Sequence, residues 1–164
     1  MLRKLVAIIG IILISNTLFA DSGNDNARLC SKEDLIGEWI LTDLQAGVSV
    51  SGATKDPWLQ PYQAFRFYAD GKMKHLTSTK PVTGEERKLY FPNMGFSNYE
   101  IDKNSVLKLT NEQWTRPIYL RCSYITADIE LPNNQKIKKG NIILDSFGKD
   151  GKIVARYQLE KTDN

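Results

Sequence analysis

Apolar and polar residues alternate over short stretches along most of this chain. The clearest stretch is Tyr62–Ala69, where Phe65 and Phe67 fall on one face and more polar residues fall on the other. A period of two is typical of a β-strand with one buried face. Long stretches with the helical period of 3.6 residues are missing from the sequence after Gly37. The pattern therefore predicts an all-β domain.

Nine segments carry this alternation or a short apolar run, with turn-forming residues on either side. The predicted strands are Glu38–Thr42, Tyr62–Ala69, Lys72–Ser78, Glu86–Phe91, Asn98–Asp102, Val106–Thr110, Pro117–Leu131 (bent or divided), Asn141–Ser146 and Lys152–Glu160. Asp70-Gly71 predicts a hairpin with a type I′ turn, in which both central residues need positive φ. Short antiparallel strands form either a sandwich or a closed barrel. Hairpins between sequence neighbours favour an antiparallel up-and-down barrel of about eight strands.

A short helical turn is expected just before the first strand. Ser31 is a good N-cap residue, and the carboxylate of Asp34 follows three residues later. Gly37 ends the segment almost at once, so we expect a single turn. The glycine permits a left-handed backbone conformation that a Cβ would penalise.

The first twenty residues have the pattern of a secretory signal peptide. Arg3 and Lys4 precede the apolar run Leu5–Ile14, and Ala20 is a small residue suited to cleavage. The run is about half of the ~20 residues that cross a bilayer, although an uncleaved anchor is the alternative. We therefore expect a signal peptide at 1–20, a flexible leader at 21–29 and one domain at 30–164. The expected location is the periplasm or the outside of the cell, with no membrane span after removal of the signal.

Composition narrows the possible chemistry. The chain has 22 Lys and Arg against 19 Asp and Glu, and loss of Arg3 and Lys4 leaves 20 against 19. Such a balance does not favour a nucleic-acid binder. One His and two Cys argue against a zinc site, so no metal or cofactor is expected. His75, with Lys72, Lys74 and Lys80 nearby in sequence, is interpreted as part of a solvated hairpin face, and we expect no enzyme.

Cys30 and Cys122 are the only two cysteines. In an exported protein they are expected to form a disulfide that stabilises the fold. The alternative is a reactive or metal-binding thiol, which no CxxC motif supports.

Gly37-Glu38-Trp39, preceded by a helical turn and followed by an up-and-down meander, resembles the lipocalin superfamily and the lipocalin-like domains of bacteria. Avidin-like barrels also begin with Gly-x-Trp. The lipocalin resemblance implies that Trp39 lies at the closed end of the barrel, where the preceding turn caps it. It also implies that Arg156 on the last strand packs over the indole ring, as a cation–π contact.

Several aromatic residues are candidates for a ligand site in the barrel. Phe65, Phe67, Tyr99 and Tyr157 are expected to point inward, where they either line an apolar pocket or fill it as core. Trp58 lies between two prolines in a long connection that, by the resemblance, covers the open end. It either contacts a ligand or anchors the loop on the rim.

Two functions follow from these patterns. The first is an exported lipocalin-like binding protein that holds a small apolar or amphipathic molecule in the barrel. The second is a protein-interaction, inhibitor or assembly module with a packed interior and no small ligand. An open interior favours the first function and a filled one favours the second.

Overall fold

The computed structural model describes residues 25–47, 56–131 and 135–162. The predicted signal peptide at 1–20 lies outside the described residues, as do the first residues of the predicted leader. Within the described ranges, no helix has the length and apolar character needed to cross a membrane.

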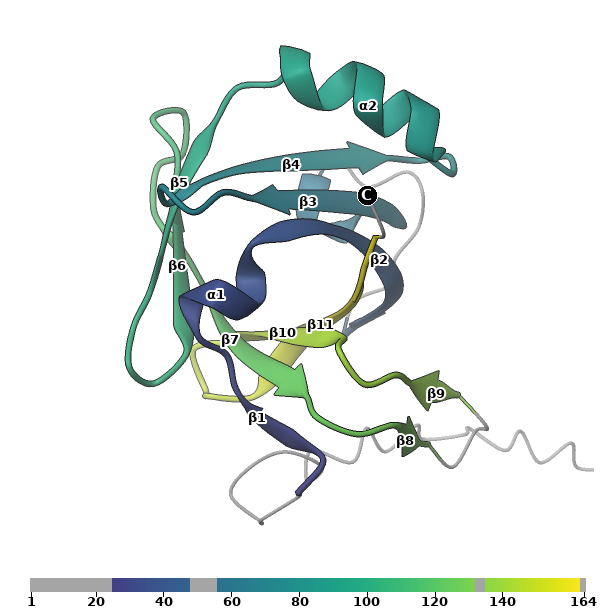
Figure 1. Cartoon of the computed structure of the whole chain (residues 1–164). Coiled ribbons are helices and arrows are strands. Elements are labelled where there is room, and N and C mark those ends of the chain that lie inside the picture. The colour runs from purple at the N-terminus through teal and green to yellow at the C-terminus, as the bar shows by residue number, and fades with distance from the viewer. Residues whose placement is uncertain (1–24, 48–55, 132–134, 163–164) are drawn as a thin grey trace, which may run out of the picture.

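Eight antiparallel strands close into a barrel (Figure 1). Each strand pairs with its neighbour in the chain, and the last pairs with the first, so the predicted up-and-down topology is confirmed. The barrel strands are β2 (Gly37–Ala46), β3 (Tyr62–Phe67), β4 (Lys72–Ser78), β5 (Ser97–Ile101), β6 (Val106–Thr110), β7 (Ile118–Ile125), β10 (Ile142–Phe147) and β11 (Ile153–Lys161).

Two small additions flank β7. Strand β1 (Ala27–Leu29) pairs with the end of β7 beyond the residues that pair with β6. Strands β8 (Ile129–Glu130) and β9 (Lys136–Ile137) form a separate two-stranded sheet, so the long predicted run Pro117–Leu131 is divided. Ile137 of this sheet packs with Ile125 and Ile143 in a small second apolar cluster.

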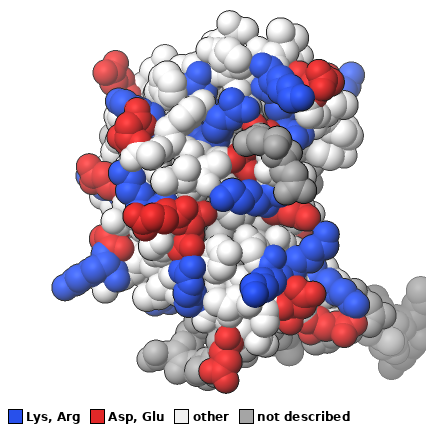
Figure 2. Space-filling model, in the orientation of Figure 1, with Lys and Arg blue, Asp and Glu red and all other residues white. Residues whose placement is uncertain are grey.

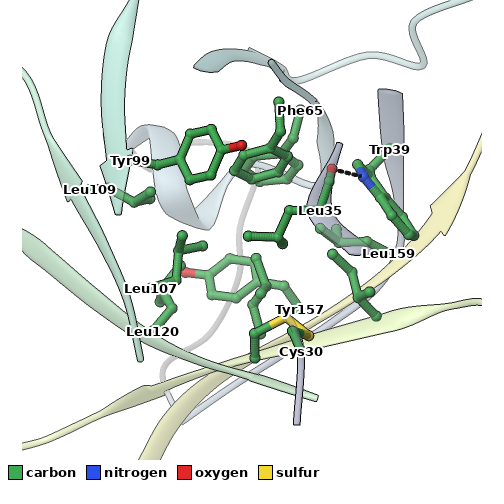
Figure 3. Packing of buried hydrophobic residues seen from close by; sticks show 14 of the residues in the cluster. Cys30, Leu35, Trp39, Phe65, Tyr99, Leu107, Leu109, Leu120, Tyr157 and Leu159 are labelled. Carbon is green, nitrogen blue, oxygen red and sulfur yellow. Dashed lines mark hydrogen bonds between the residues drawn. A yellow bond between two sulfur atoms is a disulfide. The ribbon is translucent and has the colours of Figure 1, made fainter. Parts of the chain in front are cut away.

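A single helical turn covers the closed end of the barrel, as predicted. This is α1 (Lys32–Leu35), and the backbone N–H and hydroxyl of Ser31 both donate to Asp34 Oδ2, at 2.7 and 3.0 Å. Trp39 is 1% exposed and its Nε1 donates to the backbone oxygen of Leu35 at 2.7 Å (Figure 3). The indole therefore satisfies a carbonyl at the end of α1 that the short helix leaves without a partner.

The residue over the Trp39 ring is Lys161, not Arg156. Lys161 Nζ lies 5.4 Å from the ring centroid, and a Cβ at Gly37, whose φ is +129°, would approach Lys161 Cε to 2.7 Å. The predicted role of Arg156 was wrong because of strand register: Lys161 pairs with Trp39, whereas Arg156 pairs with Gln45, six residues further along β2. Its guanidinium forms an ion pair with Asp145 on β10, with Nε and Oδ1 2.7 Å apart.

The predicted disulfide joins Cys30 to Cys122, 92 residues apart in the chain. It connects the segment before α1 to β7. Ser105 Oγ also donates to the backbone oxygen of Cys30 at 2.7 Å, so the turn between β5 and β6 is bound to the same point.

Side chains fill the centre of the barrel (Figure 3). The large members of this core come from most of the barrel strands and from α1, and each is at most 3% exposed. They are Leu35, Trp39, Phe65, Phe67, Met73, Tyr99, Leu107, Leu109, Leu120, Ile142, Leu144, Tyr157 and Leu159. An eight-stranded barrel has room for such a core or for one small ligand, and here the side chains occupy the centre.

The prediction of a strand at Glu86–Phe91 was wrong, because these residues belong to helix α2 (Gly84–Asn93). Thr83 and Glu86 form a capping box: Thr83 N donates to Glu86 Oε2 at 2.8 Å and Glu86 N donates to Thr83 Oγ1 at 3.2 Å. The helix lies across the outside of β4 (Figure 1).

The hairpin at Asp70-Gly71 is present, but its turn is not type I′. Gly71 has a φ of +84°, whereas Asp70 is not among the described residues with positive φ. Tyr68 N donates to Lys72 O and Gly71 N donates to Tyr68 O, which is the pattern of a longer loop ending in a left-handed glycine.

A buried carboxylate holds α2 to the barrel. Glu38 on β2 is 4% exposed, and its two oxygens bind Arg66 of β3 and Arg87 of α2. The Arg87 Nε to Glu38 Oε1 distance is 2.6 Å. Burial alone would raise the pKa of Glu38, but the hydrogen bonds and charges of the two arginines outweigh it and lower the pKa.

A buried lysine holds the other end of the helix. Lys74 on β4 is 4% exposed, and its Nζ donates to the backbone oxygens of Phe91 and Pro92 at 2.5 and 3.3 Å. Cations near the last carbonyls of a helix satisfy them and interact favourably with the helix dipole. Glu38 and Lys74 together therefore fix α2 against the outer face of β4.

We expect Glu38→Gln to lower the free energy of unfolding by about 3 kcal/mol, because it leaves two partly buried guanidinium groups without their counter-charge. Urea unfolding followed by circular dichroism measures the loss. The matched control is Glu85→Gln on α2, whose carboxylate pairs with Lys88 at 3.4 Å with both side chains exposed. Equal effects of the two substitutions would contradict the role given to Glu38.

Candidate functional site

The barrel wall opens between β4 and β5. Only two residue pairs join these strands, Lys72 with Asn98 and Met73 with Ser97. The chain leaves the sheet after Ser78, forms α2, and returns at Ser97, so residues 74–78 of β4 have no partner on β5. The open half of the wall lies toward the end of the barrel opposite α1, because β4 runs from the closed end to the open end.

A pocket of about 500 Å³ lies at this opening, and we call it the wall pocket. It is lined by Pro57, three residues of β4 (Lys72, His75 and Thr77), residues 95–98 at the start of β5, and residues 111–114 after β6. This volume is within the range typical of small-molecule sites.

The rim of the wall pocket is held by polar contacts. Asn111 Nδ2 donates to Ser97 Oγ at 3.0 Å and its Oδ1 accepts from the backbone N–H of Gln113 at 2.9 Å. Lys72 Nζ donates to Asn98 Oδ1 at 2.7 Å. These bonds connect the three segments that border the pocket.

His75 forms the aromatic wall of the pocket. Its imidazole stacks on Phe65, with ring centroids 4.4 Å apart and an angle of 8° between planes, and lies 4.3 Å from the Trp58 ring. The interpretation of His75 and Lys74 as a solvated hairpin face was therefore wrong. His75 packs on the side chains of the barrel interior, and Lys74, on the outward face, is covered by α2.

The imidazole is neutral at physiological pH. Burial lowers the pKa of His75 from 6.5 to about 3. His75 Nε2 and Gln63 Oε1 lie 2.8 Å apart, which joins the ring to β3. A group with so low a pKa is a weak base, so the site is better suited to hydrogen bonding and stacking than to proton abstraction.

The predicted ligand residues do not line the wall pocket. Phe65, Phe67, Tyr99 and Tyr157 are each at most 3% exposed and belong to the core. Burial raises the pKa of Tyr157 to about 12, so its phenol is neutral. Trp58, on the 3₁₀ turn η1 (Pro57–Leu59), packs on this core, and its ring centroid lies about 6 Å from those of Phe65, Trp114 and Tyr157.

The sequence did not predict that the wall pocket is lined by His75, Asn98, Asn111 and Gln113. The inward position of His75 was visible in the alternation, since it shares a face with Met73 and Thr77. One sequence pattern could have predicted the opening in the wall. Thr83 and Glu86 have the spacing of a capping box, which predicts a helix in place of a strand that would have closed the sheet.

A second pocket, of about 310 Å³, lies beside Trp39 at the closed end. Three of its charged residues form ion pairs: Lys138 pairs with Glu160 at 3.1 Å, and Asp34 pairs with Arg28 at 2.6 Å. On the face seen in Figure 2, positive and negative side chains are interspersed. Across the described ranges, no group of three or more His, Cys, Asp or Glu residues is arranged to hold a metal ion. We therefore take the wall pocket as the candidate site.

None of the known protein-family models matches this chain, and no curated protein or solved structure matches it. The closed eight-stranded barrel is consistent with a lipocalin-like fold, and that likeness rests on architecture alone.

We expect acid to destabilise the protein through His75. The unfolded chain binds a proton near pH 6.5 and the folded chain does so only near pH 3, so stability falls as pH decreases through this window. When the pH is lowered from 7 to 5, the free energy of unfolding of the wild type should fall by about 2 kcal/mol more than that of His75→Phe, which has no group at this position that titrates. Urea unfolding at both pH values measures this, and parallel losses in the two proteins would show that His75 is not held neutral.

Proposed function

We propose that this protein is an exported binding protein that holds one small amphipathic molecule in the wall pocket. The observation that carries the proposal is the opening of the barrel wall beside a filled centre. A ligand in the central lumen would have to displace the packed core, whereas the wall pocket offers about 500 Å³ without such a cost.

The lining of the wall pocket supports an amphipathic ligand. Phe96, Trp114 and the imidazole of His75 offer flat apolar surfaces, while Asn98, Asn111 and other polar side chains offer hydrogen bonds. Pockets with mostly pre-formed walls and a few convergent polar groups are typical of small-molecule sites.

Two further features support export. Residues 1–20 have the pattern of a signal peptide. The Cys30–Cys122 disulfide is the kind of bond that persists in oxidising compartments such as the periplasm.

A second candidate function is protein interaction through α2. Leu89 and Tyr90 on this helix are 62% and 44% exposed, and Phe96, after the helix, is 53% exposed. Exposed apolar side chains close together in sequence are a feature of interaction surfaces. This candidate needs no small ligand.

We expect native mass spectrometry of the protein, purified from its own compartment, to detect a bound small molecule that is lost in Gly95→Phe. A Cβ at Gly95 meets no atom within 4 Å and the backbone φ is not positive, so the new ring enters open space at the pocket without disturbing the core. The wild type and Gly95→Phe should unfold at matching temperatures, which would confirm that the variant keeps the fold.

The matched control is Lys103→Phe, which places the same side chain on an exposed turn at the closed end and should keep the bound molecule. Absence of added mass from the wild type, or its retention in Gly95→Phe, would contradict the proposal. A co-purifying polypeptide lost on Leu89→Ser would favour the interaction function instead.

A further inference from the structure

The orientation of one side-chain amide decides the chemistry of His75. Gln63 on β3 is 5% exposed, and its Nε2 donates to the backbone oxygens of Trp58 and Gln60 at 3.0 and 2.8 Å. Carbonyl oxygens only accept hydrogen bonds, so the amide nitrogen must face them. Gln63 Oε1 is thereby directed at His75.

This orientation fixes the tautomer of the imidazole. Gln63 Oε1 is 2.8 Å from His75 Nε2, and an amide oxygen accepts but does not donate. Nε2 therefore carries the proton. In a neutral imidazole the other nitrogen, Nδ1, is then an unprotonated acceptor.

His75 Nδ1 is available to accept a hydrogen bond from a ligand. Among the hydrogen bonds of the described residues, none involves His75 Nδ1, and the imidazole lines the wall pocket. The ring cannot easily turn away, because it packs against both Phe65 and Trp58, whose ring centroids lie 4.4 and 4.3 Å from its own. The pocket thus has a fixed acceptor on a rigid aromatic wall.

We propose that the wall pocket selects a neutral, flat-ringed molecule that donates an O–H or N–H hydrogen bond to His75 Nδ1. This inference rests on the proposed small-molecule function. It names phenols and ring N–H compounds as the ligand class and excludes carboxylates and phosphates, whose oxygens would face the lone pair of Nδ1.

Electrostatics at the pocket agree with a neutral ligand. Burial lowers the pKa of His75 to about 3, so the ring does not become a cationic donor for anions at neutral pH. Lys72 and Glu112 carry opposite charges on the lining, and Lys72 Nζ already donates to Asn98. The remaining surfaces, Phe96 and Trp114, suit a planar apolar ring.

Three probes with the same ring system test the inference by isothermal titration calorimetry at pH 7. They are 2-naphthol, which donates; its methyl ether, which does not; and 2-naphthoate, which is anionic. We expect 2-naphthol to bind the wild type at least about 10-fold more tightly than the ether, because the ether leaves the acceptor without a partner. We expect no binding of 2-naphthoate.

His75→Phe keeps an aromatic ring against Trp58 and Phe65 but removes the acceptor. The variant should bind 2-naphthol and the ether with equal affinity, while Lys103→Phe should keep the wild-type preference. Gly95→Phe should weaken binding of both compounds, which places them in the wall pocket.

A second measurement uses the unaltered chain, whose single histidine makes the assignment unambiguous. Long-range ¹H–¹⁵N spectra should show an unprotonated Nδ1 whose signal shifts with 2-naphthol and not with the ether. A protonated Nδ1 in the free protein would overturn the inference.

The outcomes separate the two proposals. Equal affinities of the wild type for 2-naphthol and the ether, both reduced by Gly95→Phe, would overturn the hydrogen-bond inference and leave the binding function standing. Binding of neither compound would also overturn the inference, while the bound molecule found in the native protein would decide the function separately.

Discussion

The structure depends on one buried carboxylate. Glu38 binds arginines from β3 and from α2, and the second of these contacts keeps the helix against the outside of the barrel. A buried charge is costly unless it is paired, so the position of α2 is closely specified. Lys74 adds the same constraint at the last turn of the helix, through two backbone oxygens. A helix held there occupies the length of chain that would otherwise continue the sheet, and β5 therefore joins β4 for only two residue pairs.

In the proposed function, this constraint places the binding surface at the wall of the barrel and not in the lumen. The centre of the barrel is filled by aromatic and aliphatic side chains, which supports the packed interior that sequence analysis linked to an interaction module. The opening between β4 and β5 nevertheless leaves a pocket whose back wall is the edge of that core. His75 belongs to both regions, since it stacks on Phe65 and also lines the pocket. The core thus holds rigid the acceptor that we propose discriminates between ligands.

The sequence alone predicted the barrel because its signals are local. The alternation of apolar and polar residues predicted most of the strands, and the two cysteines predicted one disulfide. Gly37 and Trp39 indicated which end of the barrel is closed. Prediction from the sequence failed where contacts between residues far apart in the chain determine the local structure. The segment Glu86–Phe91 has weak alternation, and its helix depends on a capping box and on Arg87 reaching Glu38, 49 residues away. Arg156 was misplaced because register along β11 cannot be read from spacing. Lys74 faces outward, as its polarity suggests, yet α2 buries it.

In the proposed function, the barrel wall is open at β4 and a small molecule binds there. A crystal structure of the protein saturated with 2-naphthol tests it most directly. We expect electron density for the compound between His75 and Trp114, with its hydroxyl within hydrogen-bonding distance of Nδ1 and the core side chains unmoved. Density in the central lumen instead, or β5 paired with β4 as far as Ser78 so that no opening exists, would contradict the account.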